Sequence, residues 1–220
     1  MAATENIRIT VGDGTVSGAY ARPVDAGATL VLAPGAGSDF DHPFLVGFTE
    51  ALNDAGVATL RFNFPYREAG RRLPDRAPKA IDTWRAAMAA AAALSPGHAV
   101  WAGGKSFGGR MASMAVAAGM PAAGLVFLGY PLHPPGKPDK MRDEHLYGID
   151  RPMLFVQGTR DPFGTPDELT PVVGRLRAAT LQLIDGANHS FEVRGITRPA
   201  AEVGAALAPA VVGFVRAGRG

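Results

Sequence analysis

The chain has 220 residues, of which 47% are apolar and 19% charged, with a formal net charge of +2 and no cysteine. These values are typical of one globular domain, so we expect a single domain over residues 1–220. The small net charge argues against nucleic-acid binding, and the lack of cysteine excludes disulfides and thiol catalysis. The first ten residues contain a glutamate and no apolar core, and we find no run of about 18 apolar residues. The sequence therefore predicts a cytoplasmic protein without a signal peptide or a membrane span.

The chain begins with a predicted antiparallel hairpin and then alternates between strands and helices. Residues 6–11 and 15–21 flank the turn Gly12-Asp13-Gly14 and form the hairpin. Uniformly apolar runs, which suit strands buried on both faces of a parallel sheet, cover residues 28–33, 57–62, 98–101, 123–128, 152–157 and 180–184. Helices are predicted over residues 43–55, 78–94, 110–118, 166–177 and 199–215, with a short polar helix around 140–147. This order predicts an α/β fold with a mostly parallel, doubly wound sheet of eight strands, which would bind ligands at the carboxyl ends of its strands.

One strand-to-helix turn carries the pattern G-x-S-x-G in the pentapeptide Gly104-Lys105-Ser106-Phe107-Gly108. In this context the pattern exposes a strained serine at the carboxyl end of a sheet. Glycine is expected two residues to either side, because side chains there would hold the strand and the helix apart. Two other interpretations remain open. A phosphate-binding loop would require glycine where Ala99 stands, and a structural turn would use Ser106 to cap the helix.

Asp161 and His189 follow the last two predicted strands and could activate Ser106, since a serine hydroxyl needs a base and an acid that orients the base. Asp161 could instead satisfy the backbone of its own Asp-Pro turn. Asp185 is its main rival as the residue that orients the histidine. Four other histidines compete with His189, but only His189 follows the final strand.

The glycine-rich loop after the third strand is the expected second half of an oxyanion hole. We predict that the backbone amides of Phe107 and Ala36 form this hole, with Gly37 as the alternative to Ala36. A dinucleotide-binding loop is disfavoured, because Phe40 stands where the third glycine would be needed. The residues predicted to contact substrate are Gly37, His42, Tyr66 and His133.

These motifs resemble the α/β-hydrolase superfamily, and within it the small dienelactone-hydrolase-like branch that includes testis-expressed-protein-like and histone-acetyltransferase-complex-associated hydrolase domains. The resemblance covers most of the chain, at residues 32–37, 61–66, 103–109, 130–138, 158–164 and 186–191. It implies the α/β-hydrolase fold and a serine hydrolase with Ser106, Asp161 and His189 as its triad. Some members of this branch act as scaffolds. Dienelactone hydrolases proper use cysteine at the position of Ser106, so their substrate is not expected here.

About twenty residues lie between Pro131 and Pro152, where larger members of the fold insert a helical lid, so we expect no large lid and an open site. The sequence thus predicts a serine hydrolase that cleaves a small carboxylic ester or thioester and uses no cofactor or metal. A small-molecule ester is the expected partner, and a homodimer stays open. The alternative is a non-catalytic scaffold or small-molecule receptor.

We further expect Lys105 and Arg110 to form helix-face salt bridges. The arginine-rich loop 67–76 is expected either to be internally paired or to reach a substrate anion.

Overall fold

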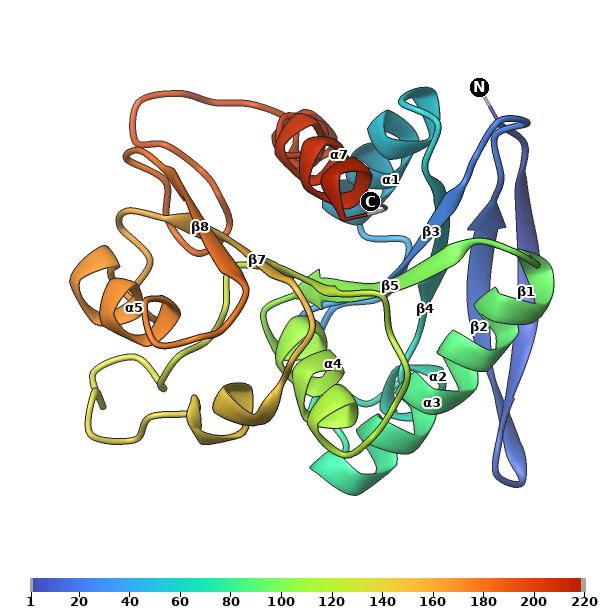
Figure 1. Cartoon of the computed structure of the whole chain (residues 1–220), viewed down its shortest axis with the longest axis horizontal. Coiled ribbons are helices and arrows are strands. Elements are labelled where there is room, and N and C mark those ends of the chain that lie inside the picture. Colours follow the sequence, from blue (N-terminus) through green and yellow to red (C-terminus); the bar gives the residue numbers. More distant parts are fainter. Residues whose placement is uncertain (1, 219–220) are drawn as a thin grey trace.

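The computed structural model describes residues 2–218 as an eight-stranded sheet with helices on both faces (Figure 1). The order across the sheet is β1-β2-β4-β3-β5-β6-β7-β8. β1 and β2 pair antiparallel, β2 also pairs antiparallel with β4, and all later pairs are parallel. This confirms the predicted sheet and its hairpin. The strands are β1 (Thr4–Val11), β2 (Gly14–Ala21), β3 (Ala28–Ala33), β4 (Ala58–Phe62), β5 (Ala99–Lys105), β6 (Leu125–Leu128), β7 (Met153–Gly158) and β8 (Ala179–Ile184).

The helices form two layers. One face of the sheet carries α1 (Pro43–Asp54), α6 (Ala200–Ala205) and α7 (Ala208–Ala217) (Figure 1). The other face carries α2 (Pro65–Glu68), α3 (Ala77–Leu94), α4 (Phe107–Ala117), α5 (Pro166–Val173) and the 3₁₀ helix η1 (Glu144–Gly148). Only η1 and its flanking loops occupy the interval between β6 and β7, in agreement with the expected lack of a large lid.

The boundaries around the serine turn differ from the prediction. β5 continues to Lys105 instead of ending at Trp101, and α4 begins at Phe107, three residues earlier than expected. Glycine is unfavourable in helix interiors, so the sequence pattern predicts a turn at Gly108 and Gly109. In the structure both residues are buried and belong to α4. As a result, Ser106 is the single residue between the strand and the helix.

The predicted C-terminal helix is two helices, α6 and α7, which are separated at Ala206 and Leu207. Pro209 has no backbone N–H and therefore cannot continue α6, but it fits the first turn of α7. By length and composition alone, Ala200–Ala217 could cross a membrane, contrary to our expectation that no such run exists. Its apolar side chains pack in the core against α1 and the sheet, which accounts for this composition; the buried ones include Val203, Leu207, Val211 and Val215.

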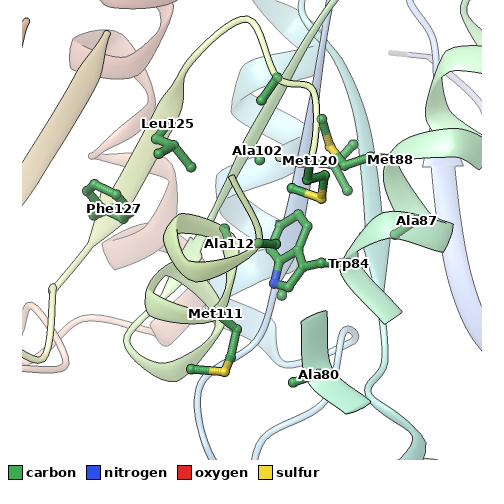
Figure 2. Close-up of a cluster of buried hydrophobic side chains, with 14 of the residues drawn as sticks. Ala80, Trp84, Ala87, Met88, Ala102, Met111, Ala112, Met120, Leu125 and Phe127 are labelled. Carbon is green, nitrogen blue, oxygen red and sulfur yellow. The ribbon is translucent and has the colours of Figure 1, made fainter. Parts of the chain in front are cut away.

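Successive strand residues supply two separate cores, one on each face of the sheet. Leu30 and Leu32 of β3 belong to the core beneath α1 and α7, whereas Val31 belongs to the core beneath α3 and α4. Figure 2 shows the second core, in which Trp84 of α3 lies beside Ala112 of α4. The Trp84 indole Nε1 donates a hydrogen bond to the Gly108 carbonyl oxygen (3.1 Å). The start of α4, directly after Ser106, is thus tied to the core.

On the opposite face, α1 and α6 approach each other closely through glycines. A Cβ atom added to Gly204 would collide with the carbonyl oxygen of Phe44, and one added to Gly47 would collide with that of Ala201. Gly213 of α7 has open space around it and is exposed. Only the first two glycines are required by packing.

We expect Gly204→Ala to lower the free energy of unfolding by about 1–3 kcal/mol, because α6 must move away from α1. Gly213→Ala, the matched control, should leave stability unchanged or raise it by up to about 1 kcal/mol, since alanine is the better helix former. Urea denaturation of both variants measures the difference. Equal stability of the two variants would show that the contact between α1 and α6 is not close.

Candidate active site

Ser106 has a strained backbone conformation, with φ 50° and ψ −115°, at the carboxyl end of β5. Positive φ is unfavourable for a residue with a Cβ atom, so the surrounding packing must enforce it. Cβ atoms added to Gly104 or Gly108 would both collide with the Ala33 carbonyl oxygen of β3. These two glycines are therefore steric requirements of the turn, as predicted. The Ser106 hydroxyl does not cap α4, which removes the structural-turn interpretation.

The structure brings Ser106, His189 and Asp161 together in one hydrogen-bonded line. His189 Nε2 lies 2.9 Å from Ser106 Oγ, and His189 Nδ1 lies 2.7 Å from Asp161 Oδ2. Because a carboxylate only accepts, Nδ1 of the neutral imidazole is the donor of the hydrogen bond to Asp161, and Nε2 then accepts the hydrogen bond of the serine hydroxyl. This is the protonation state that a general base requires.

Asp161 is fully buried and held by two further donors. Gln157 Nε2 donates to Oδ2 (3.0 Å), and the Phe163 amide donates to Oδ1 (2.9 Å). Asp161 thus both satisfies its own turn and contacts His189, so the two interpretations of this residue are compatible. Asp185, the rival of Asp161, accepts a hydrogen bond from Thr159 Oγ1 (3.4 Å) and does not contact His189.

Two backbone amides beside Ser106 are available to a ligand. Among residues 2–218, no acceptor contacts the amides of Ala36 and Phe107, and both residues line the same cavity as Ser106. The Gly37 amide donates instead to the hydroxyl of the buried Tyr66 (3.0 Å). Ala36 therefore fits the predicted oxyanion hole better than Gly37.

The cavity has a volume of about 600 Å³ and is lined by Ser106, His189 and His42, among others. His42 also caps α1, because its Nδ1 accepts a hydrogen bond from the Phe44 amide (3.3 Å). Gly37, Tyr66 and His133 do not line this cavity. His133 is buried, with Nε2 3.2 Å from Glu168 Oε2. Of the four residues predicted to contact substrate, the structure places only His42 on the cavity wall.

The predicted salt bridge of Lys105 is wrong. Its Nζ donates to the carbonyl oxygen of His189 (2.8 Å) and lies 5.5 Å and 5.7 Å from the ring centroids of Phe44 and Phe191. The two rings stack on each other, and both provide cation–π attraction. Burial lowers the pKa of Lys105 from 10.5 to about 8, and the nearby carboxylates of Asp161 and Glu192 oppose that shift. Lys105 thus connects the serine turn to the loop that carries His189.

The arginine-rich loop 67–76 is internally paired at Arg71, which agrees in part with the first of the two expectations for it, whereas Arg67 pairs with a residue outside the loop. Arg71 pairs with Asp75 (2.8 Å) and Arg67 with Asp39 (3.4 Å). No arginine of this loop lines the cavity. Residues 2–218 contain no group of three or more His, Cys, Asp or Glu side chains that could hold a metal ion. Cofactor independence stays a prediction.

A family model described as an alpha/beta hydrolase domain matches residues 26–212, which is most of the chain. The chain belongs to this family. The structure of dienelactone hydrolase from Anabaena variabilis is similar, with a TM-score of 0.81 and 21% identity over 98% of each chain. Est1E from Butyrivibrio proteoclasticus has a TM-score of 0.74 and 16% identity over 97% of this chain and 98% of its own. An alpha/beta serine hydrolase without lid from Xanthomonas campestris has a TM-score of 0.71 and 18% identity over 98% of this chain and 93% of its own.

Three residues that support this alpha/beta hydrolase site were not predicted from the sequence. Lys105 holds the His189 carbonyl, Gln157 holds Asp161, and the Phe163 ring stacks on the His189 imidazole with centroids 4.1 Å apart. Gln157 had a visible signal, because it is a polar residue that ends an otherwise apolar strand. Lys105 and Phe163 had none, since their contacts join segments far apart in the chain.

We expect the free energy of unfolding of the native chain, relative to Lys105→Met, to rise between about pH 8 and about pH 10.4. In that range the unfolded chain keeps the proton on Lys105 that the folded chain loses, so increasing pH favours folding. Urea denaturation across this range measures the rise. Lys79→Met replaces an exposed lysine and is the control; its free energy of unfolding should show the same rise with pH as that of the native chain. Parallel curves for the native chain and Lys105→Met would contradict the lowered pKa.

Proposed function

We propose that this protein is a serine hydrolase that cleaves a small carboxylic ester or thioester through an acyl-enzyme. The observation that carries the proposal is the unbroken line from Ser106 Oγ through His189 to the buried carboxylate of Asp161. The strained turn that exposes Ser106 and the two amides next to it add support. The esterases among the structural neighbours are consistent with the proposal, although their low identity bears on the fold alone.

In the proposed reaction, Ser106 Oγ attacks the carbonyl carbon while its proton moves to His189 Nε2. The amides of Phe107 and Ala36 donate to the oxygen of the tetrahedral intermediate. His189 then gives the proton to the leaving alcohol or thiol, which breaks the bond to the carbonyl carbon and leaves an acyl group on Ser106. A water molecule, deprotonated by His189 Nε2, attacks this acyl group, and the bond to Ser106 Oγ then breaks, which releases the carboxylic acid while His189 returns the proton to the serine oxygen. Asp161 keeps Nδ1 protonated and stabilises the imidazolium that forms in each step.

The cavity supports a small substrate. Its volume of about 600 Å³ lies within the range of small-molecule sites. Within residues 2–218, the interval between β6 and β7 contains no helix other than η1. The second candidate, a scaffold or small-molecule receptor, could use the same cavity. It provides no physical reason for Ser106 to be strained and paired with a histidine, because binding alone requires neither.

We expect a fluorophosphonate probe to label Ser106 in the native protein, because His189 activates the hydroxyl. Mass spectrometry of the labelled peptide identifies the site. Ser106→Ala should abolish labelling, and so should denaturing the native chain before the probe is added. Absence of labelling, or labelling that persists in Ser106→Ala, would favour the scaffold or receptor.

We expect Asp161→Asn to reduce kcat for an ester substrate by about 10²–10⁴-fold while the protein stays folded, since asparagine no longer holds His189 in the required tautomer. Asp185→Asn is the matched control and should reduce kcat much less, because Asp185 contacts Thr159 and not His189. Kinetics and thermal unfolding are measured on both variants. A reversed order of the two effects at equal stability would show that a different acid orients His189.

A further inference from the structure

The cavity beside Ser106 is positively charged. Four cationic side chains line it against one carboxylate, that of Glu192, an excess of three positive charges; the cations are Lys105, Arg110, Arg142 and Arg198. Asp161 lies beneath His189 and is fully buried. An excess of one sign in a concave site raises the local concentration of ligands of the opposite sign.

Arg110 and Arg142 are half-buried and have no acidic partner, contrary to our expectation of a helix-face salt bridge for Arg110. Among residues 2–218, no carboxylate lies within 4.0 Å of either guanidinium group. The Arg110 Nε atom is fully buried and contacts no hydrogen-bond acceptor. Burial lowers the pKa of Arg110, and the charge of Arg142 lowers it further. Half-buried guanidinium groups without an acidic partner are unfavourable, so an anion bound at this part of the cavity wall would stabilise the pair.

Hydrogen bonds fix the backbone segments that carry the two arginines. Arg110 belongs to α4, one turn after Ser106, and its amide donates to the Ser106 carbonyl oxygen (3.0 Å). The Arg142 carbonyl oxygen accepts a hydrogen bond from the buried Tyr130 hydroxyl (2.7 Å). Ser113 of α4 and His145 of η1 make a further hydrogen bond (2.8 Å) between the two segments. These contacts fix the backbone that carries each arginine, and the charge of Arg142 acts on Arg110, so the two positive groups lie near each other on the cavity wall.

We propose that Arg110 and Arg142 bind an anionic group of the substrate, a carboxylate or a phosphate, close to the ester bond that Ser106 attacks. This inference rests on the proposed function and names its substrate class, an ester or thioester that carries a negative charge. Guanidinium groups suit this role because they offer paired N–H donors that match the oxygens of both anions.

The test compares two esters of equal chain length, the mono-4-nitrophenyl ester of glutaric acid and 4-nitrophenyl pentanoate. Only the first carries a carboxylate at the end of its acyl chain. We expect its kcat/KM to exceed that of the neutral ester by about 10-fold or more, as is typical of hydrogen bonds between charged groups. Arg110→Gln should reduce this ratio to near one. Arg151→Gln is the control, because it removes one positive charge at the amino end of β7, away from the cavity, and should leave the ratio unchanged.

A competition experiment identifies the anion. Butyrate and propylphosphonate are compared as inhibitors of pentanoate hydrolysis, with 1-butanol as the neutral reference. Stronger inhibition by butyrate indicates a carboxylate subsite, and stronger inhibition by propylphosphonate indicates a phosphate subsite. Inhibition by neither anion beyond that of 1-butanol would overturn the proposal.

The two proposals fail in different ways. Ser106-dependent hydrolysis of both esters at similar kcat/KM, in the native chain and in Arg110→Gln alike, would overturn the anion subsite and leave the hydrolase proposal intact. Equal loss of the ratio in Arg151→Gln would show that the overall charge of the protein, and not the arginine pair, causes the preference. No hydrolysis of either ester, together with no labelling of Ser106, would overturn both proposals.

Discussion

The close approach of β3, β5 and α4 is the constraint on which the rest of the site depends. Gly104 of β5 and Gly108 of α4 both lie so near to the Ala33 carbonyl oxygen of β3 that neither position has room for a side chain. This proximity enforces the unfavourable conformation of Ser106, whose hydroxyl does not cap α4 and lies 2.9 Å from His189 Nε2. Backbone strain of this kind persists only where surrounding structure over-determines it. The hydrogen bond from Trp84 to Gly108 and the glycine contacts supply that support from the core.

Much of the fold and of the site geometry follows from local sequence patterns. Aliphatic runs such as residues 28–33 identify buried parallel strands, and the ends of such strands must share one edge of the sheet. The positions of Ser106, Asp161 and His189 after three of these runs were enough to predict that they meet. Their hydrogen-bonded geometry agrees with that prediction.

The remaining features depend on side chains that meet across distant segments. Lys105 and Arg110 are residue types that commonly lie on helix surfaces. In the structure, Lys105 contacts the backbone of His189, and Arg110 lines the cavity without an acidic partner. Local periodicity carries no information on which loop will cover a given residue. The same holds for His133, whose neighbour Glu168 lies 35 residues further along the chain. The break between α6 and α7 was readable in principle from Pro209, but the apolar composition of the segment obscured it.

The two tryptophans lie on opposite sides of the sheet, Trp84 in the core beneath α4 and Trp101 in the core beneath α7, where it packs edge-on against Phe214. Each layer of the molecule therefore contains its own intrinsic fluorophore. Trp84 reports on the helix that supports the serine turn, whereas Trp101 reports on the C-terminal helices. With either residue replaced by phenylalanine, emission from the other distinguishes cooperative unfolding of both layers from separate loss of one.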